Sequence, residues 1–313
     1  MKILVCDRLE EQVLDKFEEL GEITNISESK TKTEDLKSNI VDTDIVVIRS
    51  GTKINKDILE NANNLKIIAR CGVGVDNVDV EEATNKKIYV TNYPNANIIS
   101  VAELTIGLII SAARKIHVSN NSLKEKKWDR NKFLGTELYQ KQLGLVGFGK
   151  AAKEVAKRLS AFGMSIVFYD PYVDSSTIEA KKVELDELLK TSDVISIHVI
   201  KTEETTNLIS NEKLDLIKKG GILVNTSRGG IIDEEYLFQR ANEDLIFAGL
   251  DVFNQEPPDI NDTFSKSNIV TTPHLGASTY EAQLKAGLET VQNVSDILNG
   301  DFSSVLNLSL IHI

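Results

Sequence analysis

Two successive stretches of the chain alternate short runs of β-branched residues with amphipathic runs, and this alternation restricts the fold more than any other feature. It is typical of βαβ units, whose parallel strands form a sheet that helices cover on both faces. Because 313 residues exceed the size at which one hydrophobic core keeps growing, we expect two compact domains. The sequence therefore predicts an α/β protein with two doubly wound parallel sheets.

The first stretch of alternation looks flavodoxin-like. Within it, Asn55–Asn61 is expected to be helical, because an Asn that can cap a helix precedes the apolar Ile58 and Leu59. The strands predicted here are Ile3–Cys6, Ile23–Ile26, Ile45–Arg49, Lys66–Ala69 and Tyr89–Thr91.

The second stretch lies between two long predicted helices. The first, Asn97 to about Lys127, carries an apolar stripe and is expected to link the two domains. The last, about Tyr280 to Leu298, is long enough to cross back to the first domain, which would then be discontinuous. The strands predicted between these helices are Gln142–Gly147, Ser165–Tyr169, Val194–His198, Gly221–Asn225, Ile246–Leu250 and Asn268–Thr271.

Composition excludes several classes of protein. The formal net charge of −11 repels phosphate backbones and argues against general binding of nucleic acid. The apolar run Val101–Ala113 contains Glu103 and is too short to span a bilayer, and Met1–Asp7 is too short for a secretory signal. We therefore expect a cytoplasmic protein with no membrane partner. Two cysteines, Cys6 and Cys71, are too few for a disulfide framework or a thiolate metal site, so we expect both to be buried and no metal to be bound.

A glycine-rich turn follows the first predicted strand of the second stretch. Gly147 permits a tight turn, and Gly149 lets the backbone approach a pyrophosphate at the positive N-terminus of the next helix. Ala152 stands at the third glycine position and is small enough for close packing of helix on strand. The context matches a dinucleotide-binding Rossmann turn.

Asp170 strengthens this interpretation. It ends the next strand, 23 residues after Gly147 (170 − 147), where a carboxylate accepts hydrogen bonds from both ribose hydroxyls and repels a 2′-phosphate. The sequence therefore favours NAD over NADP. The same turn also suits enzymes that bind adenosyl-methionine or adenosyl-homocysteine, so it does not identify the reaction.

Hydride transfer from a carbinol carbon needs a group that exchanges the hydroxyl proton and a cation that holds the substrate. Among the four histidines, His117 and His312 are expected to be solvated. His198 ends a strand at the carboxyl edge of the sheet, where it either approaches the cofactor or packs within the fold. His274 lies between Thr-Thr-Pro and Leu-Gly-Ala-Ser in a rigid loop after the last strand, and is the preferred acid/base.

Two further segments supply partners for this histidine. Glu256 stands beside two prolines, where its carboxylate can orient an imidazole. Arg228 follows another strand with small neighbours, and its guanidinium can hold a carboxylate with two hydrogen bonds.

These segments, in this order, make the chain resemble the D-isomer-specific 2-hydroxyacid dehydrogenase family over nearly its whole length. Besides the glycine turn and the segments of Arg228, Glu256 and His274, the matching runs are Val47–Lys53, Arg70–Asn77, Asn92–Asn97 and Ser100–Leu104. The resemblance implies that a Rossmann domain for NAD, 98–284, is inserted into a flavodoxin-like substrate domain made of 1–97 and 285–313. It also implies a homodimer formed through the linker-helix region.

The resemblance assigns roles to individual residues. His274 would be the acid/base, Glu256 its partner, and Arg228 the anchor of the substrate's carboxylate and keto oxygen. The remaining cofactor contacts that it implies are Lys150, Ala151, His198, Thr226 and Asp251, beside Gly147, Gly149 and Asp170. The substrate contacts that it implies are Arg49, Arg70, Gly72, Val73, Gly74, Asn97 and Arg130.

Within the family, the resemblance is strongest to the branch that oxidises phosphoglycerate, the first step of serine biosynthesis. It implies a phosphorylated 2-hydroxy acid whose phosphate meets cations away from Arg228, and the candidates are Arg49, Lys53, Arg130 and Lys132. A glyoxylate or hydroxypyruvate reductase of the same family, and an NAD-sensing corepressor, remain alternatives.

Two departures from the family are visible. His198-Val-Ile-Lys201-Thr replaces the His-x-Pro-Leu-Thr of many relatives, which puts the contact with the adenosine ribose in doubt. The chain ends shortly after the last helix, so we expect a short form without a regulatory domain and without inhibition by serine through one.

Overall fold

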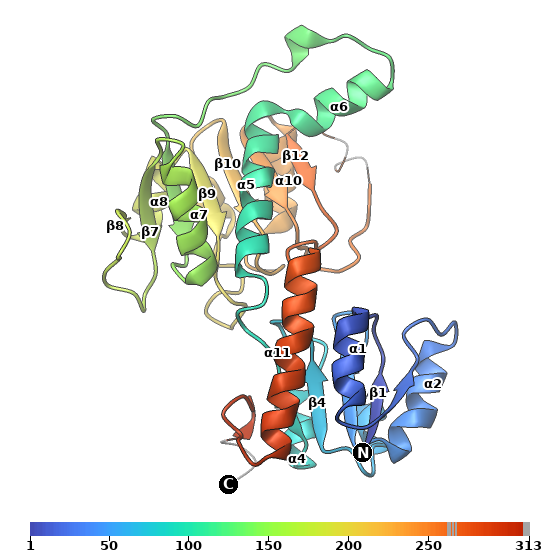
Figure 1. Ribbon diagram of the computed structural model, residues 1–313. Coiled ribbons are helices and arrows are strands. Elements are labelled where there is room, and N and C mark those ends of the chain that lie inside the picture. Colours follow the sequence, from blue (N-terminus) through green and yellow to red (C-terminus); the bar gives the residue numbers. More distant parts are fainter. Residues whose placement is uncertain (262–263, 265, 267, 309–313) are drawn as a thin grey trace. The chain divides into compact units, whose positions relative to one another are not determined.

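The structure, a computed structural model, describes residues 1–261, 264, 266 and 268–308, and His312 lies outside this set. The chain forms two compact units, Met1–Asn97 with Ala277–Ile313 (unit 1) and Ile98–Gly276 (unit 2) (Figure 1). Unit 1 resumes at Ala277, whereas the sequence predicts a boundary at 285. The reason is that helix α11 (Tyr280–Leu298) bonds to unit 1 from its first turn, where Gln283 Oε1 accepts from Arg49 Nη1 at 3.2 Å.

Unit 1 contains a parallel sheet with the strand order β2-β1-β3-β4-β5, as in flavodoxin. Its strands are β1 (Lys2–Val5), β2 (Glu22–Asn25), β3 (Ile45–Ile48), β4 (Ile67–Arg70) and β5 (Tyr89–Thr91). One face packs on α1 (Glu11–Glu18) and α11, and the other on α2 (Lys32–Asn39), α3 (Lys56–Glu60) and α4 (Val80–Asn85), with the short η1 (Ile40–Asp42). Alternate residues of β1 enter the two cores, because successive side chains of a strand point to opposite faces.

Unit 2 contains a seven-stranded parallel sheet with the order β12-β11-β10-β9-β6-β7-β8. Its strands are β6 (Gln142–Val146), β7 (Ser165–Tyr169), β8 (Lys181–Lys182), β9 (Val194–Ile197), β10 (Gly221–Asn225), β11 (Ile246–Leu250) and β12 (Ile269–Thr271). From β6 the chain adds β7 and β8 on one side, and then β9 to β12 on the other side. The point between β6 and β9 where the strand order reverses is where open α/β sheets bind ligands. The predicted fold class is confirmed, and each predicted strand is present with ends that differ by at most one residue.

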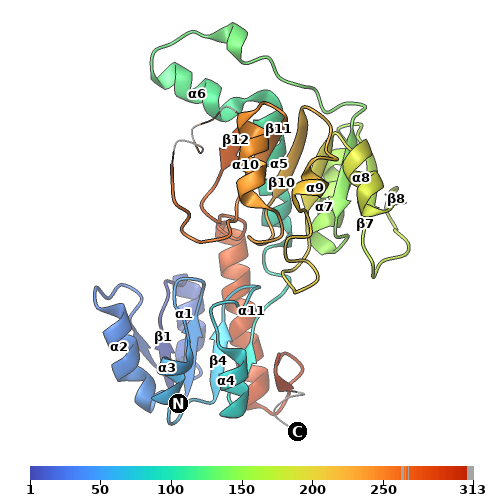
Figure 2. The ribbon, with the colours of Figure 1, turned by 180° about the vertical axis from the view of Figure 1, so that it is seen from behind.

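Helices cover both faces of the unit 2 sheet (Figures 1 and 2). One face packs on α5 (Ile98–Arg114) and α7 (Lys150–Ser160). The opposite face packs on α8 (Leu185–Thr191), α9 (Asn211–Leu214) and α10 (Glu234–Asn242).

The single linker helix predicted from Asn97 to about Lys127 is wrong, because the chain breaks at Lys115. This residue adopts a left-handed conformation (φ 51°) that separates α5 from α6 (Ile116–Lys124). The carbonyl of Ala113 accepts a hydrogen bond from Thr136 N at 2.8 Å instead of from the next helical turn. From the break, α6 and the connection after it, with the short η2 (Arg130–Lys132), extend away from the sheet as an arm, residues 115–139 (Figures 1 and 2).

Both cysteines are buried, as predicted. Burial raises the pKa of the Cys6 thiol to about 12 and that of Cys71 to about 11, so neither is a thiolate at neutral pH. Across the described ranges, no helix combines the length and apolar character needed to cross a bilayer. The same residues include no cluster of three or more His, Cys, Asp or Glu side chains that could hold a metal ion.

Candidate functional site

The glycine turn of unit 2 leaves β6 and enters α7. Gly147 has a φ of 86°, and a Cβ there would lie 2.6 Å from the carbonyl oxygen of His198, so only glycine fits. Gly149 caps α7, and a Cβ placed on it meets no protein atom within 4 Å. The turn therefore presents bare backbone and a helix N-terminus to open space, which fits a pyrophosphate.

Asp170 follows β7 and holds the turn from the side. Its Oδ2 accepts from Phe148 N and its Oδ1 from Tyr172 N, both at 2.8 Å. Each carboxylate oxygen has two acceptor positions, so capacity for ribose hydroxyls remains. The predicted NAD-binding arrangement of Gly147, Gly149 and Asp170 is thus assembled at the switch point of the sheet.

Two other predicted cofactor residues direct their side chains into the protein. His198 Nε2 lies 2.9 Å from Ser196 Oγ, and burial lowers the pKa of the His198 imidazole to about 4, so the ring is neutral at pH 7. The hydroxyl of Thr226 bonds to that of Thr105 on α5 at 2.7 Å. The following residues of the turn differ in exposure: Lys150 is exposed and Ala151 partly buried.

His117, which the sequence predicts to be solvated, is partly buried on α6. Its Nδ1 lies 3.4 Å from Ser111 Oγ. The prediction of a freely solvated side chain is wrong here because the His117 ring, just after the break at Lys115, contacts Ser111 near the end of α5.

His274 and Glu256 form a hydrogen-bonded pair in unit 2. The His274 Nδ1 atom lies 2.7 Å from Glu256 Oε2, and both side chains remain partly exposed. Glu256 Oε1 also accepts from Phe253 N at 3.2 Å, which fixes the carboxylate. With Nδ1 bonded to the carboxylate, Nε2 is the ring nitrogen left for chemistry.

Asp251 organises the loop that carries His274. Its buried carboxylate accepts from Thr272 Oγ1 and Leu275 N, each at 2.6 Å, and from Gly276 N at 2.9 Å. Burial raises the pKa of Asp251, and these hydrogen bonds work against that rise. His274 itself has a φ of 54°, a strained conformation that costs on the order of 1–3 kcal/mol and that this network maintains.

Arg228 follows β10 in a loop tied together by Asn225. The Asn225 side chain accepts from Ser227 N at 3.0 Å and donates to the Arg228 carbonyl at 2.8 Å. Gly229 then approaches the backbone of Phe253 so closely that a Cβ would lie 1.8 Å from its carbonyl oxygen. The loop of Arg228 is therefore packed directly against the segment that leads to Glu256.

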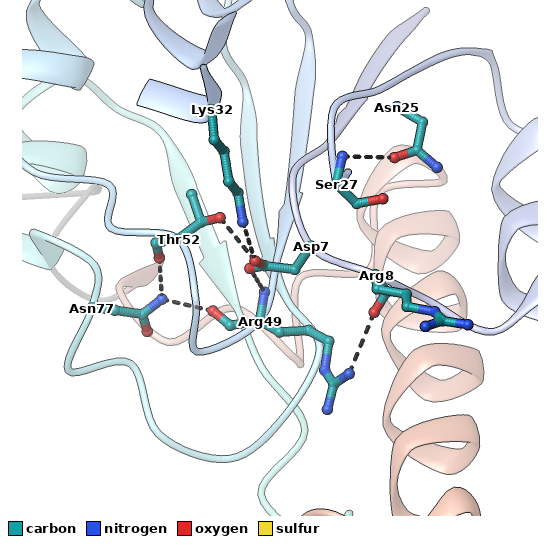
Figure 3. Close-up of polar contacts among 8 residues, drawn as sticks. All are labelled: Asp7, Arg8, Asn25, Ser27, Lys32, Arg49, Thr52 and Asn77. Carbon is teal, nitrogen blue, oxygen red and sulfur yellow. Dashed lines mark hydrogen bonds and ion pairs between the residues drawn. The ribbon is translucent and has the colours of Figure 1, made fainter. Parts of the chain in front are cut away.

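In unit 1, Asp7 fixes the segment that carries Arg49 (Figure 3). Its carboxylate accepts from Arg49 N and Lys32 Nζ, both at 2.6 Å, and from Thr52 Oγ1 at 3.0 Å. The Arg49 guanidinium points the other way and donates to the Arg8 carbonyl at 3.3 Å. Arg49 is thus a cation held at the carboxyl edge of the sheet.

Arg70 ends the neighbouring strand and folds back over Gly72. Gly72 has a φ of 148°, and a Cβ on it would lie 1.6 Å from Arg70 Nη1, so the arginine occupies the space that a side chain would need. Gly72 O accepts from Tyr93 N at 2.9 Å, and Val73 O accepts from the Asn92 amide. Gly74 and Asn97 are partly buried residues of the same unit.

The structure does not bring Arg130 to Arg228 within unit 2. The middle of α5 lies beside the Arg228 loop, because Thr105 bonds to Thr226. The arm follows the C-terminal end of this helix, nine residues or about 14 Å beyond Thr105. Arg130 and Lys132 lie exposed on that arm, and Lys53 is exposed in unit 1.

Sequence reasoning missed three side chains that hold the site together: Asn225, Asn254 and Lys32. Asn254 Oδ1 accepts from Gly230 N at 2.6 Å, and Lys32 bonds to Asp7. Asn254 and Lys32 each contribute through one tertiary hydrogen bond, and Asn225 contributes through local bonds to Ser227 and Arg228. Neither kind of contact leaves a periodic pattern in the sequence.

Comparison with known proteins gives one matching family model and several close relatives. Residues 106–276 match the model of the D-isomer specific 2-hydroxyacid dehydrogenase, NAD binding domain. The chain is 46% identical over 314 aligned residues to a D-3-phosphoglycerate dehydrogenase of Methanocaldococcus jannaschii, covering 98% of this chain and 60% of that relative. The chain thus spans less than two thirds of that relative's length.

A second relative is matched along nearly its whole length. The hydroxypyruvate reductase of Thermotoga maritima is 47% identical over 297 residues, covering 94% of this chain and 97% of the relative. Among solved structures, the D-lactate dehydrogenase of Aquifex aeolicus complexed with NAD and lactic acid aligns with a TM-score of 0.82 and 27% identity over 97% of each chain.

Proposed function

The chain belongs to the D-isomer specific 2-hydroxyacid dehydrogenase family, and from that premise we propose that it oxidises D-3-phosphoglycerate to 3-phosphohydroxypyruvate with NAD. The observation that carries the proposal is the connected arrangement of Arg228, Glu256 and His274 at the same carboxyl edge of the unit 2 sheet as the glycine turn. The similarity to D-3-phosphoglycerate dehydrogenases supports the choice of substrate. Serine biosynthesis is the pathway that this reaction would serve.

In the proposed mechanism, bound NAD supplies the acceptor for the C2 hydride. His274 takes the hydroxyl proton at Nε2, because Glu256 occupies Nδ1 and sets the tautomer. Arg228 binds the substrate carboxylate and stabilises the oxygen as it becomes a carbonyl. The substrate loses a hydride with two electrons and one proton, which leaves the keto acid; reduction reverses the same steps.

We assign the distal phosphate to Arg49, with Arg70 and the Gly72–Gly74 backbone at the other end of the substrate. Support comes from the rigid mounting of Arg49 by Asp7. A dianionic phosphate needs such fixed cations, since each charge-assisted hydrogen bond is worth on the order of 1.5–3 kcal/mol.

We also propose that two copies of the chain pair through the arm. Large apolar side chains are exposed along it, including Leu123, Trp128 and Leu134, which are 57%, 81% and 85% exposed. A second copy would cover this apolar surface. Such pairing is the route by which Arg130 of one copy could serve the substrate of the other.

The test follows NADH absorbance with 3-phosphohydroxypyruvate, hydroxypyruvate and glyoxylate in turn, with His274→Ala as the blank. We expect kcat/KM for the phosphorylated acid to exceed that for hydroxypyruvate by about 100-fold, equivalent to about 2.7 kcal/mol of phosphate binding. Arg49→Ala should remove most of this preference. Arg8→Ala is the matched control, because only the backbone carbonyl of Arg8 contacts Arg49.

A second candidate is a hydroxypyruvate reductase. The 47% identity to the hydroxypyruvate reductase of Thermotoga maritima favours it. Preference for hydroxypyruvate that survives Arg49→Ala would establish this alternative and refute the phosphoglycerate assignment.

A further inference from the structure

Asn254 connects the loop of Arg228 to the segment of Glu256. Its Oδ1 accepts a hydrogen bond from Gly230 N at 2.6 Å, two residues after Arg228. Its own backbone N–H donates to Glu234 Oε2 at 2.9 Å. One exposed asparagine is therefore held on both sides, by a loop and by a helix terminus.

The connection continues to the acid/base pair. Gly229 lies against the carbonyl of Phe253, and the N–H of Phe253 donates to Glu256 Oε1 at 3.2 Å. Glu256 in turn holds His274. A shift of the turn at Asn254 would thus change the position of Arg228 relative to the Glu256–His274 pair.

Glu234 is placed to hold this turn. It is the first residue of α10, where the helix dipole favours a negative charge, and it is partly buried. Burial, with a smaller contribution from the charge of Glu256, raises the pKa of Glu234. Partial burial of a charged carboxylate costs solvation free energy, and the hydrogen bond that Glu234 accepts from the Asn254 backbone offsets this cost.

We propose that Asn254, held by Glu234, is a positioning residue that fixes Arg228 relative to Glu256 and His274. Its kinetic consequence rests on the proposed function, whereas the hydrogen bond to Gly230 is a property of unit 2 alone. Asn254 touches neither substrate nor cofactor in this role.

The kinetic test compares Asn254→Ala with Asn254→Asp, which keeps an oxygen at the same position. We expect Asn254→Ala to lower kcat/KM for the keto acid about 10- to 100-fold, since a misplacement on the scale of 1 Å costs that much. KM for the keto acid should rise while the dissociation constant of NADH stays within about twofold. Asn254→Asp should recover most of the activity, and Gln255→Ala, the matched neighbour, should behave as wild type.

Amide hydrogen exchange gives a readout that needs no substrate. The Gly230 amide should exchange about tenfold faster in Asn254→Ala than in the wild type and in Asn254→Asp, because one hydrogen bond is lost. Unchanged exchange and unchanged kcat/KM in Asn254→Ala, or an equal loss in Asn254→Asp, would overturn the inference. Lack of turnover in the wild type would instead refute the proposed function. The exchange comparison would then still test the inference about Asn254.

Discussion

Replacing Gly149 with alanine separates the demands of the fold from those of the cofactor. The residue has φ −75° and ψ −168°, which alanine adopts readily, and an added Cβ meets no protein atom within 4 Å. Alanine is a poorer N-cap than glycine, which destabilises the fold. It also lowers the conformational entropy of the unfolded chain, which stabilises the fold by about 0.4–1 kcal/mol. These effects nearly cancel, so we expect the free energy of unfolding to change by less than about 1 kcal/mol.

Binding of NADH should respond quite differently. A methyl group at Gly149 would occupy the open space where the backbone meets the pyrophosphate, at the N-terminus of α7. Loss of about two charge-assisted hydrogen bonds, each worth on the order of 1.5–3 kcal/mol, corresponds to a weakening of at least about 100-fold.

Calorimetric titration with NADH and thermal unfolding, both on Gly149→Ala, measure the two quantities independently. Gly147→Ala is the contrasting control, because its left-handed φ of 86° and the 2.6 Å approach to His198 O should destabilise the fold by about 2–5 kcal/mol. A folded Gly149→Ala protein that binds NADH as tightly as the wild type would refute the assignment of the pyrophosphate to this turn.

Three further predictions concern other parts of unit 2. Gly229→Ala should lower stability by about 1–3 kcal/mol and kcat/KM about 100-fold, measured by urea unfolding and NADH absorbance, because its Cβ would lie 1.8 Å from Phe253 O. Asp170→Asn should weaken the binding of NADH about tenfold and reduce the preference for NADH over NADPH, because the charge that repels the 2′-phosphate of NADPH is removed. A fluorescence titration with each cofactor measures both effects. The pKa of His198 falls from 6.5 to about 4 on folding, so the unfolded chain binds the extra proton and stability drops as pH falls below 6.5. Between pH 7 and pH 5 the loss of unfolding free energy due to His198 amounts to at most about 2 kcal/mol. Urea unfolding at the two pH values should show this loss in the wild type and not in His198→Gln.

Central strands such as β3 could be predicted because burial on both faces leaves a continuous apolar run, and the last helix because its buried residues recur at helical spacing. α11 begins at Tyr280 and ends at Leu298, as predicted, since Thr279 caps it through a bond to Ala282 N. The break at Lys115 could not be predicted, because it depends on Thr136 capturing a helical carbonyl. The two-residue strand β8 is too short to leave a pattern.

For the candidate site, the sequence singles out Arg228, Glu256 and His274 by their chemistry, and the structure links their segments. The side chains that position them could not be predicted, because Asn254 acts through one hydrogen bond to a residue 24 positions away. Asp251 has, in addition, a structural task that the sequence pattern did not predict. Both of its carboxylate oxygens already accept hydrogen bonds from the loop of His274, so its first task is to shape that loop.

The discontinuity of unit 1 has a consequence for synthesis of the chain. Val13 of α1 packs against Gly287 of α11, so the first 97 residues cannot complete their core until the last helix emerges. Translation at roughly 5–20 residues per second puts about 10–40 s between residue 97 and residue 298. Unit 2 is made entirely within this interval and can fold first. During that time one apolar face of the sheet formed by the first 97 residues stays exposed until α11 has been synthesised.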